Sequence, residues 1–450
     1  MKGTLDIVAG SLIDGVADQP KTNCSLRVKD GRIVALWEGT HAPAEAKDPA
    51  DRVLDARGKT VMPGLIDAHC HISYGEGRSA EEVDVYGGAE WAAVRAVWNC
   101  GKVLRAGVTS FCDPGSTWLV AVTARDAIAS GMFPGPRIFA AGRHIVADGG
   151  FADYFPSWLG MPVSAEGVLC HTREEMVREV RQQVKNRVDL VKISGDSQAQ
   201  ERQEGAGPCL SDEEMQAIVA TAHELGRKTT IHARYANTVV AAVRAGIDWL
   251  IHASYMRSED IGFVRDARTP ICPTFTFTAN IVEWGKDVGV DRNYIEVKKH
   301  ELDALARIHR RAYESGITML AGSEAGFSVT PYGDWHTREL ELMVDLIGMS
   351  PMAAIKAATS NNAAAFGWAG DVGTLQRGAR ADIIVVDGDP LADIGILGDQ
   401  KKLLTILHGG DEVDRAKPIP ERKRMSHERG FSVSALKLPR TDINRRRSQA

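Results

Sequence analysis

The sequence lacks the features that mark membrane, secreted and fibrous proteins. No apolar run reaches the about 18 residues that a membrane-spanning helix needs. The first eight residues, MKGTLDIV, contain an acidic residue where a signal peptide would have its apolar stretch, so we expect a cytoplasmic protein. With 44% apolar and 25% charged residues, the composition is that of a globular chain and excludes a disordered or fibrous one.

Paired cysteines are missing too. The seven cysteines are odd in number and scattered, and no two have the CxxC spacing. This pattern argues against a disulfide framework and fits free thiols in a reducing compartment.

Charge is unevenly spread, with an excess of positive charge only at the end of the chain. The whole chain carries a net charge of −5, yet the residues from 417 onward hold ten Lys and Arg against three Asp and Glu. The rest of the chain is therefore strongly acidic, which argues against a nucleic-acid-binding groove. We predict that residues 417–450 form an extended basic tail that lies across the acidic surface of its own or a neighbouring subunit.

The 450 residues exceed one ordinary domain, and their pattern changes twice along the chain. β-rich segments with tight turns fill residues 1–60 and return in residues 369–416. We expect these two parts to form one small composite β-sandwich domain.

Between them, short apolar segments alternate with longer helical patterns. Eight of these segments lack period-two alternation, as strands buried on both faces do. They cover residues 65–71, 108–113, 137–145, 190–194, 229–232, 249–253, 271–277 and 318–322. We therefore predict an α/β fold in which residues 61–368 form a (β/α)8 TIM-type barrel.

Histidines and one lysine stand at the ends of the predicted strands or inside them. His69 and His71 are spaced i, i+2 at the end of the first strand, so that they can share one metal ion. His232 ends the fifth strand and His252 the sixth, at the face where barrel active sites lie. Lys192 lies inside an apolar strand, where a lysine is costly unless it is neutralised, paired or modified.

A carboxylate completes this set, because Glu324 follows the eighth predicted strand. Four histidines, one lysine and one carboxylate then meet at one end of one barrel. The sequence therefore predicts a metal centre at this end.

The segment VMPGLIDAHCH at residues 61–71 resembles the signature of the amidohydrolase superfamily. GSLIDG at 10–15 and KDGRIV at 29–34 resemble its N-terminal β segment, and AAT at 357–359 with GARADIIVVDGDP at 378–390 resemble its closing helix and returning strands. The intervals of 40, 20 and 72 residues from Lys192 through His232 and His252 to Glu324 resemble one branch of it. That branch contains Xaa-Pro dipeptidases, imidazolonepropionase-like proteins and ochratoxin-type amidases, and bacterial phenylurea and thiocarbamate hydrolases resemble a neighbouring branch.

The resemblance implies a site for one or two divalent ions. His69 and His71 would bind the more buried ion, and His232 and His252 the more exposed one. Lys192, carboxylated on its amine, would bridge them. Zinc suits these ligands, although manganese or cobalt would also fit. A metal-activated hydroxide would attack the substrate carbonyl.

At strand eight the chain departs from the family, which usually has aspartate where this sequence has Glu324. The longer side chain keeps the carboxylate but leaves a single-metal site with fewer ligands as an alternative. As the catalytic residue, Glu324 would take a proton from the nucleophile and deliver it to the leaving nitrogen.

Three further residues are candidate substrate-binding groups. Arg234 and Tyr235 follow His232 at the predicted barrel mouth and can bind a carboxylate or a carbonyl, and His144 closes the third predicted strand. Aromatic residues within 151–158 and 275–277 indicate either an aromatic substrate pocket or plain core packing.

These features predict a metal-dependent hydrolase that cleaves a linear amide-type C–N bond in an aryl amide, a phenylurea or a carbamate. The alternatives are a dipeptidase or carboxypeptidase for Xaa-Pro or N-acyl amino acids, a non-catalytic barrel kept as an interaction scaffold, and a deaminase of cyclic substrates. We expect a small-molecule substrate, a homo-oligomer, and neither a nucleic-acid nor a membrane partner.

Overall fold

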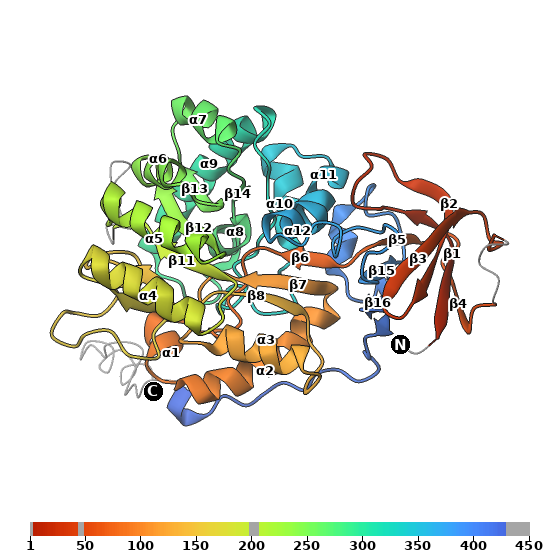
Figure 1. Ribbon diagram of the computed structural model, residues 1–450, viewed down its shortest axis with the longest axis horizontal. Helices are drawn as coiled ribbons and strands as arrows, with labels where there is room; N and C mark the ends of the chain where they lie inside the picture. Colours follow the sequence, from red (N-terminus) through yellow and green to blue (C-terminus); the bar gives the residue numbers. More distant parts are fainter. Residues whose placement is uncertain (1–2, 44–48, 198–206, 429–450) are drawn as a thin grey trace, which may run out of the picture.

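The computed structural model describes residues 3–43, 49–197 and 207–428. Figure 1 shows a β-sheet built from the chain ends beside a larger part in which helices surround parallel strands. The mixed α/β character predicted from the sequence is confirmed. Among the described residues, none of the helices combines the length and the apolar composition needed to cross a bilayer.

Both ends of the chain contribute to one eight-stranded sheet, in the order β17-β16-β15-β5-β1-β2-β3 with β4 beside β1. β15 pairs antiparallel with β5, so that Ile384 lies opposite Met62 and joins the two ends. Apolar side chains from both ends, among them Leu26 and Ile383, pack in one buried cluster. The strands are β1 (Thr4–Leu12), β2 (Lys21–Lys29), β3 (Arg32–Glu38), β4 (Arg52–Asp55), β5 (Thr60–Pro63), β15 (Ile383–Val386), β16 (Leu403–His408) and β17 (Asp411–Glu412).

The larger part contains two parallel sheets, β6-β7-β8 and β10-β9-β11-β12-β13-β14. A single parallel bridge, Ala141 to Leu190, links the two sheets on one side. On the other side, Met319 bridges to Ile271, and Ala68 donates to the Ala321 carbonyl at 2.8 Å. These strands are β6 (Leu65–Asp67), β7 (Val108–Asp113), β8 (Arg137–Ala140), β9 (His144–Val146), β10 (Gly167–Leu169), β11 (Leu190–Ser194), β12 (Lys228–Tyr235), β13 (Trp249–Tyr255) and β14 (Ile271–Cys272).

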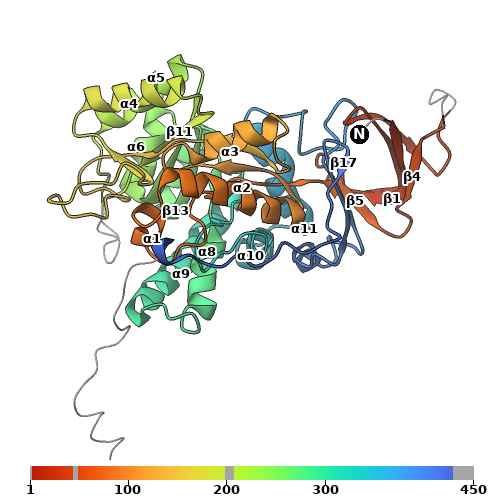
Figure 2. The same cartoon turned by 90° about the horizontal axis from the view of Figure 1, so that it is seen from below.

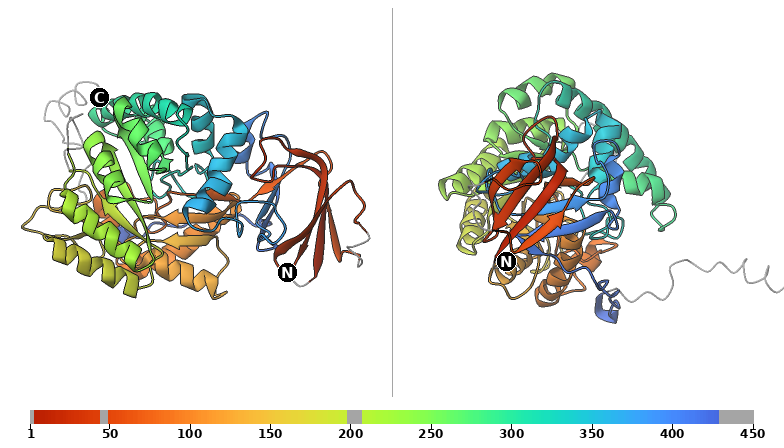
Figure 3. Two further views of the ribbon diagram at one scale, coloured as in Figure 1. Left: turned by 45° about the horizontal axis from the view of Figure 1, so that its top comes forward. Right: turned by 90° about the vertical axis from the view of Figure 1, so that its right-hand side faces the viewer.

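Helices alternate with these strands along the chain and pack around them, as the views in Figures 2 and 3 show. The capping box at the start of α5 is present, with the Ser211 hydroxyl and the Glu214 side chain bonded to each other's backbone N–H. The helices are α1 (Ala80–Asp84), α2 (Ala89–Arg105), α3 (Val120–Ala129), α4 (Arg173–Lys185), α5 (Asp212–Glu224), α6 (Ala236–Ala245), α7 (Ile261–Asp266), α8 (Phe275–Trp284), α9 (Arg292–Glu314), α10 (Arg338–Ile347), α11 (Pro351–Lys356) and α12 (Asn362–Ala365).

Several strand predictions were too long. Residues 65–71 form a strand only up to Asp67, and residues 137–145 are split between β8 and β9. Residues 271–277 give a two-residue strand, after which Thr274 adopts a left-handed φ of 60° and α8 begins. In the described chain, residues 318–322 make single ladder contacts through Met319 but no strand. An apolar run indicates that a segment is buried, but it does not indicate at which residue the hydrogen-bonded pairing of the strand ends.

The last described residues, 414–428, form a strap along α2, which Figure 1 shows in blue below that helix. Arg105 donates to the Asp414 carbonyl at 2.8 Å, and Arg424 donates to a Glu82 carboxylate oxygen at 2.7 Å and to the Glu76 carbonyl. The strap therefore fastens the segment that follows β6 from outside. Residues 429–450 of the predicted tail lie outside the described residues.

Candidate metal centre

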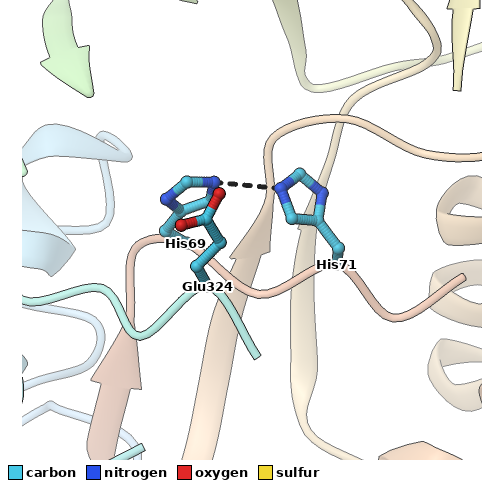
Figure 4. A group of neighbouring side chains, drawn as sticks. All are labelled: His69, His71 and Glu324. Atoms are coloured by element: carbon cyan, nitrogen blue, oxygen red, sulfur yellow. Dashed lines mark hydrogen bonds between the residues drawn. The ribbon is translucent and has the colours of Figure 1, made fainter. Parts of the chain in front are cut away.

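Three buried side chains meet at the end of β6. His69, His71 and Glu324 each offer one ligand atom, and these atoms all lie within 4.8 Å of one another. Figure 4 shows the two imidazoles facing each other with the carboxylate beside His69. The distance between the two Nε2 atoms is 2.9 Å.

His69 is fixed by its own backbone and by a neighbouring loop. Its N–H donates to Asp67 Oδ1 at 2.8 Å, and its Nδ1 lies 3.0 Å from the Thr274 hydroxyl. Asp67 also accepts from the Ser323 hydroxyl and binds His336 Nδ1 at 2.7 Å, so one carboxylate ties both ligand-bearing segments together. Burial, with the nearby charge of His71, lowers the pKa of His69 well below its usual value. The imidazole is thus held neutral, the form that binds metal ions.

His71 is oriented by a backbone carbonyl. Its Nδ1 lies 2.8 Å from the Gly115 carbonyl oxygen, which can only accept. Nδ1 therefore carries the hydrogen, and the Nε2 lone pair points at His69. The ring also stacks on Tyr74, with centroids 4.2 Å apart and an interplanar angle of 5°.

Glu324 sits on a strained stretch of backbone. Its φ is 56°, and its N–H donates to the His69 carbonyl at 2.6 Å. His252 and Thr274, both beside the centre, have φ values of 75° and 60°. Left-handed conformations of residues other than glycine are unfavourable and gather where function demands a fixed geometry. Burial also raises the pKa of Glu324.

Lys192 and His252 lie next to this group. The Lys192 side chain on β11 is 1% exposed, and its burial lowers the pKa of the amine to about 8. The His252 ring lies 5.5 Å from that of His69, and its buried Nε2 has no hydrogen-bond partner among the described residues. The unpartnered Nε2 of His252 can bind a metal ion or accept a hydrogen bond, and it lies near Lys192, whose amine can lose its proton.

His232 lies next to His252. Its ring is 4.6 Å from that of His252 and stacks on Phe151 at 3.8 Å. The Arg234 guanidinium donates to His232 Nε2 at 2.6 Å, so this nitrogen faces an arginine rather than the three-residue group. Burial, with the charge of Arg234, lowers the pKa of His232.

The residues present fit one divalent ion well. Two nitrogen ligands of a zinc ion, each about 2.0–2.1 Å from it, lie about 2.9–3.4 Å apart, which matches the spacing of the His69 and His71 Nε2 atoms. A carboxylate completes a donor set that zinc accepts. A second position would rest on His252, on Lys192 and on the Nδ1 of His232, because Arg234 occupies Nε2 of that ring.

Aromatic rings surround the centre. Phe327 lies 6.4 Å from the His71 ring and 5.1 Å from the rings of both Tyr74 and Phe277. Together with Phe151 on His232, these rings give the site an apolar wall.

The three candidate substrate-binding residues lie in different settings. The His144 ring is 6.1 Å from that of His71, and neither of its buried nitrogens has a partner in the described part of the chain. Arg234 lies against His232, as described. Tyr235 is buried, stacks on Tyr255 at 5.5 Å and lines a narrow cavity with Arg234.

Sequence reasoning missed two groups near the site. Asp67 stood inside the quoted motif, and its proximity to the ligands was the available signal. Lys298 and Glu301 are spaced i, i+3 on α9, which from sequence alone looks like an ordinary surface ion pair, yet they are 4% and 3% exposed.

Comparison with known proteins gives concordant matches. A sequence model of the amidohydrolase family matches residues 60–413. Ochratoxinase of Aspergillus niger is 27% identical over 432 residues, covering 90% of this chain and 85% of that protein. The crystal structure of a Xaa-Pro dipeptidase with bound methionine matches with a TM-score of 0.80 and 28% identity over 91% of this chain and 99% of that chain. Phenylurea hydrolase B shares the fold, with a TM-score of 0.75 and 22% identity over 92% of this chain and 97% of that chain.

Proposed function

Because the chain belongs to the amidohydrolase family, we propose that it is a metal-dependent hydrolase of a linear amide-type C–N bond in an aryl amide, a phenylurea or a carbamate. The observation that carries this proposal is the buried group of His69, His71 and Glu324 beside Lys192. The same membership supports a closed (β/α)8 barrel over residues 61–368 and a composite β-sandwich from residues 1–60 and 369–416.

We propose zinc as the ion, held by His69, His71 and Glu324 and by Lys192 carboxylated on its amine. Such an ion supplies an acidified water and polarises a carbonyl. Lys192 is suited to carboxylation because its pKa of about 8 leaves about a tenth of the amine neutral at pH 7, far more than an ordinary lysine has. We propose that His232 and His252 would bind a second ion of the same kind.

The protein's own groups would move the protons and hold the substrate. Glu324, with its raised pKa, takes a proton from the attacking water and delivers it to the nitrogen as the C–N bond breaks. His144, with free ring nitrogens, bonds the substrate carbonyl or its oxyanion. Arg234 and Tyr235 bind the far end of the substrate, and Phe151 and Phe327 support an aryl group.

The test begins with protein stripped of metal by a chelator and then loaded with Zn²⁺, Mn²⁺ or Co²⁺. We expect hydrolysis of N-aryl amides, phenylureas or carbamates to return with the metal. Glu324→Gln should lower kcat by about 10²–10⁴-fold, whereas Glu314→Gln on the exposed face of α9 should leave it unchanged. Turnover of Xaa-Pro dipeptides alone would favour the dipeptidase alternative. If the protein bound no ion and hydrolysed none of these substrates, the proposal that it is an enzyme would be refuted.

A further inference from the structure

A cavity lies outside the metal centre, between α9 and the loop that follows β13. Its volume is about 880 Å³, which falls within the about 300–1,000 Å³ of small-molecule pockets. Residues 254–259, part of α9 and Leu346 on α10 line it. Within the described ranges, the side chains of the metal centre and its aromatic rings are not among the lining residues. Figure 1 shows α9 beside β13, with α7 above both.

The buried part of this lining is apolar. Met256 and Ile308 are 4% and 7% exposed, and Leu346 is half-buried. Ala304 and Ala306 contribute only methyl groups, which leaves room between the helix and the loop. Such a surface can receive an aromatic or aliphatic group of a ligand.

Three arginines of α9 also line the cavity. Arg310 and Arg311 follow Arg307 at i, i+3 and i, i+4, so both are its neighbours on the helix surface, about 5–6 Å away between Cβ atoms. In the part of the chain that the structure describes, none of the three forms an ion pair with a carboxylate. Asp303 and Glu314, one turn away on the same helix, are not among the lining residues. A ligand in the cavity therefore meets three guanidinium groups on this side.

The charges on the loop side bind one another. Glu259 lies 3.6 Å from Arg257, and Asp260 accepts from Arg257 Nε at 2.8 Å. Glu259 is the single acidic residue among the described residues that line the cavity. When Asp260 is counted with the lining, four arginines stand against two carboxylates, an excess of two positive charges.

Two of the three α9 arginines are held at the cavity by hydrogen bonds. Arg310 Nη2 donates to the Leu346 carbonyl at 3.0 Å, and Arg311 Nη1 donates to the Ser258 hydroxyl. Leu346 and Ser258 both belong to the lining. A guanidinium has five N–H donors, so each arginine keeps donors for a ligand after these bonds are made. Planar groups with several fixed donors suit the oxygens of a phosphate.

We propose that this cavity is a second binding site, for a small organic phosphate whose apolar part packs on Met256, Ile308 and Leu346 while Arg307 and Arg311 bind its phosphate oxygens. A phosphate monoester carries a charge of about −1.5 to −2 at pH 7 and three acceptor oxygens, which matches the excess of two positive charges. A single carboxylate would leave one of these charges unmatched. The site does not depend on the proposed function, because it shares no residue with the metal ligands.

Calorimetric titration of the zinc-loaded full-length protein with 1-naphthyl phosphate tests the site. Arg307→Gln combined with Arg311→Gln should raise the Kd by about 10–100-fold, the worth of one charge-assisted hydrogen bond, whereas Arg292→Gln at the exposed start of α9 should leave it unchanged. Ala304→Phe, which fills the cavity and keeps every charge, should also weaken binding. Inorganic phosphate and 1-naphthoate should each bind more weakly, because the first lacks the apolar part and the second carries less charge.

A phosphate could also bind to a zinc ion at the metal centre, and the His71→Ala variant separates the two positions. The cavity predicts the same Kd in this variant as in the wild type, whereas loss of binding would place the probe on the metal. Absence of binding to the wild type, or binding that neither the arginine variant nor Ala304→Phe weakens, would refute the site. Equal Kd values for 1-naphthoate and 1-naphthyl phosphate would refute the choice of a phosphate. If the arginine variant has a lower Tm, Ala304→Phe decides.

Discussion

The two walls of the site are held by different forces. On the ligand wall, formed by His69, His71 and Glu324, backbone groups set the geometry: the Gly115 carbonyl orients His71, and the Glu324 N–H donates to the His69 carbonyl. On the charged wall, formed by Arg234, Lys298 and Glu301, long side chains hold one another by charge. Short contacts to fixed backbone suit a metal ion, which tolerates little displacement, whereas a buried ion-pair cluster is stable only as long as each charge keeps its partner.

The largest expected effect is on the ligand wall. His71→Ala removes one of two imidazoles that face each other at 2.9 Å, so we expect loss of the bound ion and a fall in kcat/KM of at least about 10³-fold. Metal analysis and a hydrolysis assay measure both. His41→Ala, at an exposed position, is the matched control. If the His71→Ala variant kept its full metal content, the proposal that the ligand wall holds the ion through His71 would be wrong.

The charged wall should respond in stability instead. Glu301→Leu leaves two buried cations without their shared carboxylate, which should destabilise the fold by about 3–5 kcal/mol. Denaturant unfolding measures this change, and Glu314→Leu at the exposed end of the same helix should cost under about 0.5 kcal/mol. Adding Lys298→Met to Glu301→Leu should recover part of the lost free energy of unfolding, because it removes one of the two unpaired cations. If the effects of the two substitutions simply added up, the charges would not stabilise one another.

A third effect is a dependence of stability on pH beside the charged wall. Burial lowers the pKa of His309 on α9 to about 4, while an unfolded histidine titrates near 6.5. Between these values the unfolded chain binds a proton that the folded chain does not, so stability falls as the pH drops from about 6.5 to 4. His309→Gln should remove about 2 kcal/mol of this loss at pH 5. Unfolding at pH 8 and pH 5 measures it, with exposed His300→Gln as the control.

The smallest effect is expected at the strap. Arg424 pairs with Glu82 at 2.7 Å while its own side chain is 30% exposed. Arg424→Gln should therefore lower stability by under about 1 kcal/mol, as measured by thermal unfolding against Lys423→Gln. Bound metal should stay the same; loss of the ion from this single change would mean that the ligand wall depends on side-chain charge after all.

The sequence predicted the residues of the ligand wall but not most of the contacts of the charged wall. The motif at residues 61–71 identified the family, and the family match confirms the resemblance. His69, His71 and Glu324 could be foreseen as neighbours because parallel strands end at one edge. The contact of Arg234 with His232 could not, because it depends on the rotamer of a long side chain. Nor could the burial of Lys298 and Glu301, since i, i+3 spacing is the same on a buried helix face as on an exposed one.

The strap gives the chain a particular order of completion during synthesis. Arg424 and Glu82, which it pairs, are 342 residues apart, and a chain is made from its N-terminus at about 5–20 residues per second. His71 therefore leaves the ribosome tens of seconds before the residues that fasten the loop behind it. A nascent chain therefore carries its first two ligands before the strap fastens the segment that follows them.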